Sequence, residues 1–145
     1  MSTEQNKAIV RRFLQEGINK GNAGIADELF SPDFISHFAG VPGPLHGVEA
    51  WKQLASGYFT AFPDLHVTAE DYIAEGDKVV ARWTWRGTHL GAMMGIPPTS
   101  KQVNLTGMGI YRIVANKIAE QWVQEDLLGM LQQLGVIPAP EQARA

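Results

Sequence analysis

Two neighbouring carboxylates, Glu125 and Asp126, are the side chains of this 145-residue chain best placed for acid/base chemistry. They stand at the end of an alternating stretch that predicts a β-strand. A carboxyl group at the mouth of an apolar cavity has a raised pKa, because burial penalises its charged form, and it can then accept a proton near neutral pH. Asp126 has a structural alternative, since it stands where the N-cap of a following helix would accept backbone N–H bonds.

If Glu125 points inward, the alternation of a strand places Gln121 and Val123 on the same inward face. We predict that Glu125 or Asp126 transfers the proton, and that His37 and Gln121 orient the substrate as polar neighbours. Covalent catalysis is not indicated, because no serine lies in a Ser-His-Asp context.

The histidines do not predict a metal site. His37, His46, His66 and His89 lack the i, i+2 or i, i+4 spacing that places two ligands on one element. The chain has no cysteine, which excludes disulfides, thiol nucleophiles and cysteine-based metal sites. We therefore predict a site without metal or cofactor. His89 could either line a pocket or fix the turn of its loop.

A second alternating stretch, from Val79 to Arg86, carries two tryptophans on one face. Trp83 and Trp85 could point inward and stack on a flat substrate, or outward and form a dimer surface, since large apolar patches seldom stay exposed. Arg82, on the opposite face, could form an exposed or interfacial ion pair, or stabilise a developing oxyanion. The sequence leaves these alternatives open.

The elements that would position these residues are helices first and strands afterwards. Apolar periodicity predicts helices over about Glu4–Asn19, Ala23–Phe30, Val48–Phe62 and Asp126–Gly135. Alternation and turn residues predict strands over Phe34–Phe38, Leu65–Glu75, Lys78–Thr88, Gln102–Val114 and Lys117–Glu125. The predicted fold class is α+β, with helices packed on one side of a curved antiparallel sheet.

Length and charge narrow the possible partners. We predict one domain over residues 1–137 and a flexible C-terminal tail over 138–145. A formal net charge of −3 without a basic run argues against nucleic acid. Because no apolar stretch approaches the roughly 20 residues of a membrane span, we expect no membrane insertion and a cytoplasmic protein.

The connection Arg86–Thr99 holds three glycines, two prolines and one histidine, which predicts a shaped loop on which Met93 and Met94 present an adaptable apolar surface. This loop resembles one found in the SnoaL-like polyketide cyclases, or ester cyclases, of the NTF2-like superfamily. Similar segments follow in the family's order at Asn6–Phe13, Leu29–Phe34, Ala61–Leu65 and Leu131–Gly135. The resemblance implies a cone in which helices and sheet enclose a pocket.

The resemblance also implies a departure at the catalytic position. Family cyclases use an aspartate on the closing strand as general acid/base in an intramolecular aldol condensation, and that position falls at Val123 here. A polar partner on the preceding strand falls near Gly109, and a pocket asparagine falls at Ser36. The catalytic set of the family is therefore not present as such.

Two functions follow from these observations. The first is a cofactor-independent acid/base enzyme of cyclase, isomerase or hydrolase type on a small apolar cyclic or polyketide-like molecule. The second is a non-catalytic small-molecule-binding protein, favoured by Val123. We predict a homodimer, with Trp83, Trp85 or Met108 as surface candidates. The predicted substrate-binding residues are Gln121, Val123, Trp122, Met93, Met94, Trp51, Tyr58, Arg82, His89 and Met108.

Overall fold

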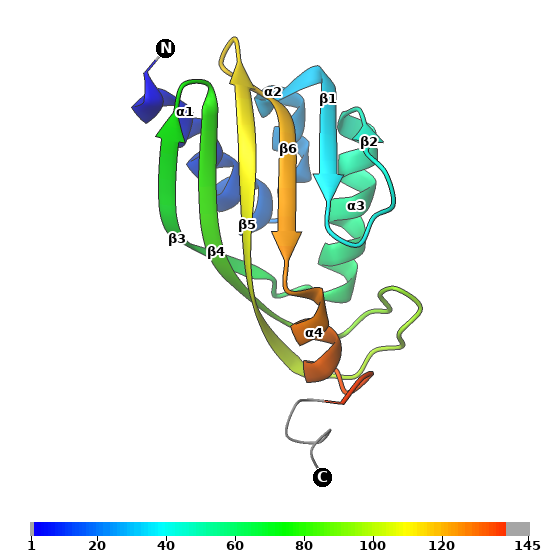
Figure 1. Ribbon diagram of the computed structural model, residues 1–145. Coiled ribbons are helices and arrows are strands. Elements are labelled where there is room, and N and C mark those ends of the chain that lie inside the picture. The colour runs from blue at the N-terminus through cyan, green and yellow to red at the C-terminus, as the bar shows by residue number, and fades with distance from the viewer. Residues whose placement is uncertain (1, 139–145) are drawn as a thin grey trace.

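The computed structural model describes residues 2–138, which form a curved six-stranded sheet with helices against one face (Figure 1). The helical segments are α1 (Thr3–Arg12), η1 (Phe13–Ile18), η2 (Ala23–Ile25), α2 (Ala26–Leu29), α3 (Val48–Ala61) and α4 (Leu127–Gln133). The strands are β1 (Phe30–Phe38), β2 (Leu45–His46), β3 (His66–Glu75), β4 (Lys78–Thr88), β5 (Gln102–Val114) and β6 (Lys117–Glu125). Of the predicted tail, 138–145, all but Pro138 lies outside the described residues.

The strands cross the sheet in the order β2-β1-β6-β5-β4-β3. β4, β5 and β6 begin and end where the sequence predicts, and β3 begins one residue later. These four strands form the predicted antiparallel meander. Its two tight turns use left-handed backbone at Gly76, with φ of 59°, and at Ala115 and Asn116, with φ of 50° and 64°.

The first strand differs from the prediction in length and direction. β1 begins at Phe30 rather than Phe34, and it pairs with β6 in parallel, so the sheet is mixed rather than wholly antiparallel. The β1–β6 register shifts between Phe30 and Ile35, around Pro32, which has no N–H to donate to a ladder. The proline that indicated the end of a helix therefore lies inside an interrupted strand.

The first predicted helix, Glu4–Asn19, changes its hydrogen-bonding pattern midway. It begins behind a capping box of Ser2 and Gln5 and is α-helical as far as Arg12. The segment from Phe13 to Ile18 is a π-helix, a conformation often found at functional sites. The last predicted helix is shorter than expected, because α4 covers only Leu127–Gln133.

Trp83 and Trp85 point inward, towards the helices. Their exposed fractions are 5% and 2%, and both belong to the buried core, so the outward alternative does not hold. Phe13, on η1, contacts Trp51 of α3 and Tyr111 of β5, with ring centroids 5.4 and 5.9 Å apart. The core therefore lies between the helices and the inner face of the sheet.

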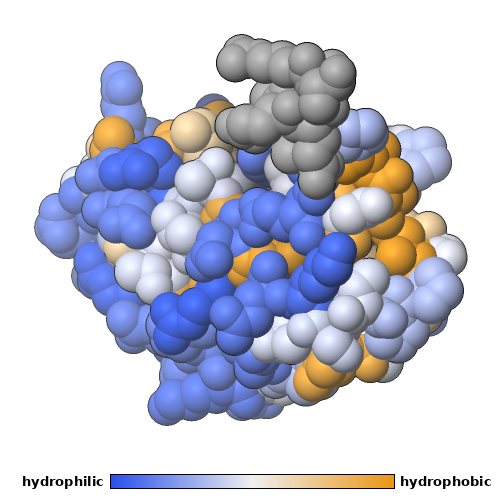
Figure 2. All heavy atoms as spheres, turned by 90° about the horizontal axis from the view of Figure 1, so that it is seen from below, coloured by the Kyte–Doolittle hydropathy of each residue, from blue (hydrophilic) through white to orange (hydrophobic). Residues whose placement is uncertain are grey.

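Apolar side chains are also exposed at the end of the molecule formed by α4 and the loop after β4. Leu90, Met94 and Leu128 are more than half exposed. Figure 2, which views this end from below, shows hydrophobic areas among hydrophilic ones. No helix within residues 2–138 is long and apolar enough to cross a membrane.

Asn19 joins the end of the first helical segment to the edge of the sheet. Its Oδ1 accepts a hydrogen bond of 2.6 Å from the N–H of Val67, and its Nδ2 donates one of 2.9 Å to the C=O of Val67. Since β3 is an edge strand, its outward backbone groups have no strand partner. The Asn19 amide takes the place of that partner at Val67.

We predict that Asn19→Ala lowers the free energy of unfolding by about 1–3 kcal/mol, because buried backbone groups of Val67 lose their partner. Urea denaturation measures this loss. The exposed neighbour Lys20 is the control, and Lys20→Ala is expected to stay within about 0.5 kcal/mol of the parent. Equal stability of the two variants would contradict the role given to Asn19.

Candidate active site

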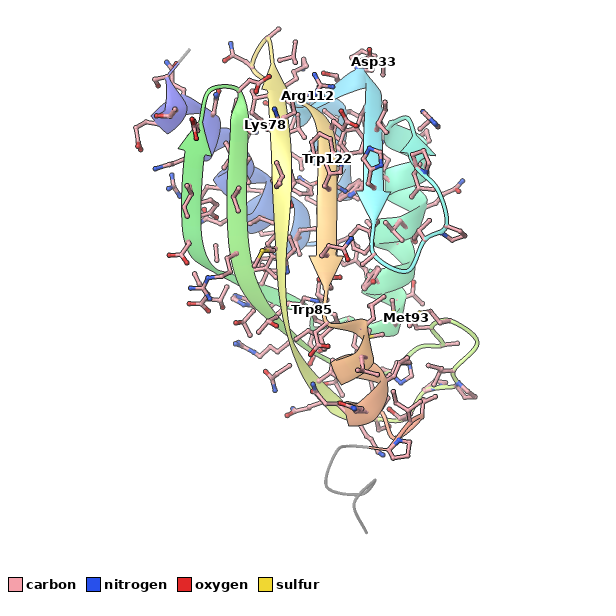
Figure 3. All side chains as sticks on the ribbon, in the orientation of Figure 1. Asp33, Lys78, Trp85, Met93, Arg112 and Trp122 are labelled. Atoms are coloured by element: carbon pink, nitrogen blue, oxygen red, sulfur yellow. The ribbon has the colours of Figure 1, made fainter. Side chains whose placement is uncertain are left out.

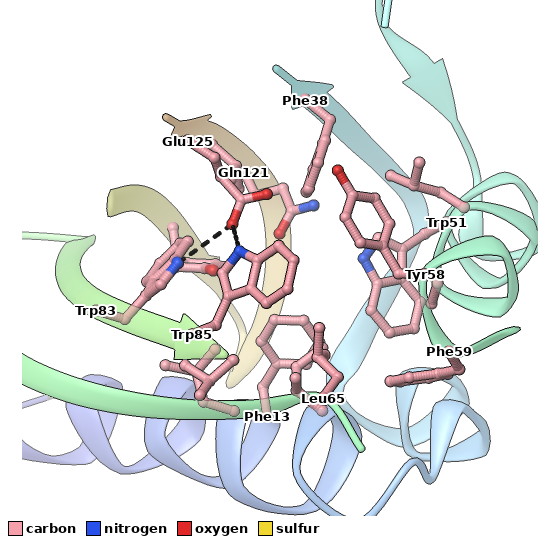
Figure 4. A pocket seen from close by; sticks show the side chains of 17 residues that line it. Phe13, Phe38, Trp51, Tyr58, Phe59, Leu65, Trp83, Trp85, Gln121 and Glu125 are labelled. Atoms are coloured by element: carbon pink, nitrogen blue, oxygen red, sulfur yellow. Dashed lines mark hydrogen bonds between the residues drawn. The ribbon is translucent and has the colours of Figure 1, made fainter. Parts of the chain in front are cut away.

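An aromatic cavity lies between the inner face of the sheet and the helices η1 and α3. Seventeen residues line it, and its empty volume is about 590 Å³ including the open mouth (Figure 4). Trp51, Tyr58 and Phe59 of α3 form one side, and Trp83 and Trp85 of β4 form the sheet side. A concave, mostly apolar lining with a few polar groups is typical of small-molecule sites.

Glu125, the last residue of β6, is the one charged side chain among the described residues that line the cavity. Its Oε2 accepts a hydrogen bond of 2.7 Å from the indole N–H of Trp85 and a longer one of 3.4 Å from that of Trp83. Burial raises the pKa of Glu125, and the two indole N–H groups oppose this only in part. The result is a carboxyl group that holds its proton more tightly than an exposed carboxyl does.

The two oxygens of Glu125 have different surroundings. Both indoles donate to Oε2, whereas no group within residues 2–138 donates a hydrogen bond to Oε1. Oε2 is therefore engaged as an acceptor, and Oε1 is the oxygen available to exchange a proton with a bound molecule.

Gln121 lies on the same inward face of β6, two positions before Val123. Its Nε2 donates a 2.8 Å hydrogen bond to Oγ of Ser36, and both residues are buried. The parallel pairing of β1 and β6 places Ser36 directly opposite Gln121. The contact fixes the carboxamide at the cavity wall, where it can hydrogen-bond to a ligand.

Two tyrosines also line the cavity, Tyr58 from α3 and Tyr111 from β5. Burial raises the pKa of both phenols, and the nearby negative charge of Glu125 raises it further. Both tyrosines therefore remain protonated and can donate a hydrogen bond to a carbonyl oxygen.

The structure brings five of the predicted site residues together at the cavity: Glu125, Gln121, Val123, Trp51 and Tyr58. It places Asp126 elsewhere. This side chain is exposed, and its Oδ1 accepts a 2.9 Å hydrogen bond from the N–H of Gly129, which makes Asp126 the N-cap of α4. Asp126 therefore has the structural role of a helix cap, and Glu125 is the carboxylate that lines the cavity.

Four further predicted residues lie on the outer face of the sheet. His37 stacks on Trp122 at 5.4 Å and contacts Glu120 at 2.7 Å. Arg82 pairs with Asp71 at 2.7 Å, and Met108 is half exposed. Alternation explains these positions, because each is one residue removed along its strand from a residue that faces inward.

Three predicted residues belong to the loop between β4 and β5 and are not among the lining residues of the described chain. His89 is fully buried, and its Nδ1 accepts a 3.2 Å hydrogen bond from the N–H of Thr99 and lies 3.0 Å from the hydroxyl of Thr99. It therefore fixes the two ends of the loop. Met93 and Met94 belong to a tight turn closed by hydrogen bonds between Met93 and Ile96, and Met94 is 54% exposed. Met93 lies near the lower end of α3 (Figure 3).

Several residues that line the cavity were not predicted from the sequence in their observed roles. It offered Trp83 and Trp85 for stacking but did not foresee that their N–H groups hold Glu125. The lining residues Phe13, Phe38 and Leu65 were also not singled out. The available signal was the requirement that each buried indole N–H find an acceptor. No three His, Cys, Asp or Glu side chains cluster as a metal site in the part of the chain described.

A curved sheet covered by helices over an aromatic cavity with one inward carboxylate defines an α+β protein of the NTF2-like type. The chain belongs to the SnoaL-like polyketide cyclase family, whose profile matches residues 8–134. The resemblance and the fold class predicted from the sequence are thus confirmed, apart from the parallel β1–β6 pair.

Relatives place the chain among polyketide cyclases at the family level. It is 30% identical to nogalonic acid methyl ester cyclase of Streptomyces nogalater, over 81% of this chain and 88% of that protein. It is also 30% identical to an aklanonic acid methyl ester cyclase of Streptomyces peucetius, over 97% of each. A crystal structure from Jannaschia sp. CCS1, assigned as a SnoaL-like polyketide cyclase, superposes with a TM-score of 0.87 at 26% identity, covering 94% of this chain and 95% of that one.

The raised pKa of Glu125 predicts a specific dependence of stability on pH. The folded state holds the Glu125 proton more tightly than the unfolded state, so the free energy of unfolding falls as pH rises from the ordinary carboxyl range through the raised pKa. Glu125→Gln lacks this fall, and its stability relative to the parent therefore increases with pH. Urea denaturation across that pH range measures the difference.

Glu120→Gln is the matched control with the opposite sign. The contacts with His37 and Arg112 lower the pKa of Glu120, so its contribution to stability is present above the ordinary carboxyl pKa and is lost as pH falls. A Glu125→Gln difference that is flat with pH would show that Glu125 titrates normally.

Proposed function

We propose that this protein is a cofactor-independent acid/base enzyme of cyclase or isomerase type that acts on a small, apolar, cyclic or polyketide-like molecule. The observation that supports it is the Glu125 carboxylate inside an aromatic cavity, with Oε2 held by two indoles and Oε1 free to transfer a proton. The cyclase names of the relatives support the reaction class.

The proposed reaction needs only a proton transfer in each direction. Oε1 of Glu125 removes a proton from the carbon next to an ester carbonyl, and the electron pair of that C–H bond forms an enolate. The enolate carbon attacks a second carbonyl of the same molecule and forms the new C–C bond. The oxygen of that second carbonyl takes the proton back from Glu125, so the product is an isomer of the substrate.

The other polar groups of the cavity have supporting roles in this proposal. Gln121, held by Ser36, and the phenol of Tyr58 orient the carbonyl oxygens, while Trp51 and Val123 form apolar wall. The described lining has no lysine, arginine or histidine to balance a second negative charge. An ester is therefore a better match than a free carboxylate, which Glu125 would repel.

A non-catalytic ligand-binding protein is the second candidate. It is favoured by Val123, at the position where the resemblance places the aspartate of the family cyclases. In that case Glu125 would serve only as a hydrogen-bonding group for the ligand. Measuring turnover and binding on the same variants separates the two candidates.

We predict that Glu125→Gln lowers turnover by about 10²- to 10⁴-fold, the usual contribution of a general acid/base, while ligand affinity is retained. Nogalonic and aklanonic acid methyl esters, the compounds in the relatives' names, are the probes. Chromatography measures the cyclised product, solvent deuterium uptake measures proton removal, and tryptophan quenching measures binding.

Asp126→Asn is the control, because asparagine caps a helix as well as aspartate does, and turnover is expected to stay near the parent value. Full activity of Glu125→Gln would refute the proposed role of Glu125. Binding of both esters by the parent, with neither deuterium uptake nor cyclisation, would favour the binding protein.

We also propose a homodimer that pairs through the outer face of the sheet. Met108 and Ile110 of β5 are 50% and 38% exposed there, next to Trp122 on β6. Since Trp83 and Trp85 point inward, Met108 is the surviving candidate of the three predicted from the sequence. The cytoplasmic location stays a prediction.

Met108→Asp is expected to convert the dimer to the 15.9 kDa monomer, because it places a charge in the apolar interface. Sedimentation velocity measures the mass. Met94→Asp, at an equally exposed methionine of the β4–β5 loop, is the control and should leave the dimer intact. A monomeric parent protein would rule the dimer out.

A further inference from the structure

Trp83, Gly107 and Glu125 form one row across three neighbouring strands. Trp83 of β4 pairs with Gly107 of β5, and Gly107 pairs with Glu125 of β6. Adjacent strands lie about 4.8 Å apart, so the two outer members of this row are about 10 Å apart with a strand between them. Their side chains still meet, at 3.4 Å from Nε1 to Oε2, directly over the central glycine.

The space above β5 is occupied by the Trp83 indole. A Cβ added at Gly107 would lie 2.8 Å from Nε1 of Trp83 and 3.2 Å from Cγ of Glu125. A Cβ added at Gly109 would lie 3.0 Å from Cη2 of the same indole. The ring therefore lies along β5 over both glycines, an arrangement known from aromatic residues that cover glycines in sheets.

The backbone does not itself require glycine at these two positions. Neither Gly107 nor Gly109 has a φ in the left-handed region. A residue with a side chain could therefore adopt the same strand conformation, and the nearest atom to its Cβ at position 107 would be Nε1 of the indole, followed by the backbone oxygen of Gln124 at 3.0 Å. Glycine at these two positions matters because it leaves space for the indole.

We propose that Gly107 and Trp83 are positioning residues for Glu125: the missing side chain at 107 admits the Trp83 indole, which, with that of Trp85, fixes the carboxylate so that Oε1 alone exchanges protons. This inference rests on the proposed function for its catalytic meaning. The geometry on which it is built, the row over β5, exists whether or not the protein has turnover.

The two indoles hold the carboxylate from different directions. Trp85 comes from the next inward position of β4 and donates at 2.7 Å, whereas Trp83 comes across β5. A single donor restrains the carboxylate by one hydrogen bond along one direction. With two donors converging on one oxygen, rotation breaks two hydrogen bonds, so the plane of the carboxylate is held more firmly.

The test titrates Glu125 directly by carbon NMR on full-length protein labelled at the glutamate side-chain carboxyl, with Glu125→Gln to assign the signal. Trp83→Phe and Trp85→Phe each remove one N–H group that stabilises the charged form, so both are expected to raise the pKa of Glu125, and the double variant raises it further. Trp122→Phe, on the outer face, is the control and leaves the pKa unchanged.

Gly107→Ala tests the space over β5. It is expected to move the indole and to raise the pKa of Glu125 in the same direction as Trp83→Phe. Gly57→Ala, at an exposed glycine of α3 with open space around it, is its control. Should Gly107→Ala fail to fold, Trp83→Phe still decides the question.

An unchanged Glu125 titration in Trp83→Phe overturns the proposal, as does an unchanged titration in folded Gly107→Ala. Because the NMR measurement requires no substrate, this result is separate from the fate of the proposed function. If Glu125→Gln keeps full turnover but Trp83→Phe shifts the titration, the positioning is real and the catalytic role of Glu125 is not.

Discussion

The burial of the Glu125 carboxylate is the constraint around which the site is built. A charged carboxylate among aromatic side chains is costly unless donors surround it, and a buried indole N–H is costly without an acceptor. Trp83, Trp85 and Glu125 satisfy these needs for one another. Because they come from β4 and β6, with β5 between them, the contact also determines which side chains β5 can carry. Glycine at positions 107 and 109 of β5 leaves the room that this contact needs.

Strand alternation explains how much of the site could be predicted from the sequence. The pattern of β6 placed Gln121, Val123 and Glu125 on one face, and the structure brings all three to the cavity. Trp122 and Met108 were assigned to the site by residue type instead, and both lie on the outer face. The position of a residue within the alternation was therefore the more reliable guide, because it decides the face before chemistry decides the role.

Other features depend on contacts between distant segments, which alternation does not predict. Ser36 reaches Gln121 only because β1 pairs in parallel with β6, across 85 positions of the chain. Pro32 was interpreted as the end of a helix, yet β1 continues through it with a register shift. His89 was open between two roles, and its contacts with Thr99 show that it fixes the loop. In each case the residue was noticed in the sequence, but the distant segment that it contacts could not be predicted from local pattern.

Two positions at which the resemblance implies polar groups lie close to the contact between Trp83 and Glu125. The resemblance places the family's aspartate at Val123 and a polar partner near Gly109, and neither group is present. Glu125 lies two residues further along the same face, about 7 Å away along the strand. Glycine at 109 leaves the space that the Trp83 ring fills on its way to that carboxylate. A side chain at 109 would therefore conflict with the indole whose N–H group reaches Glu125.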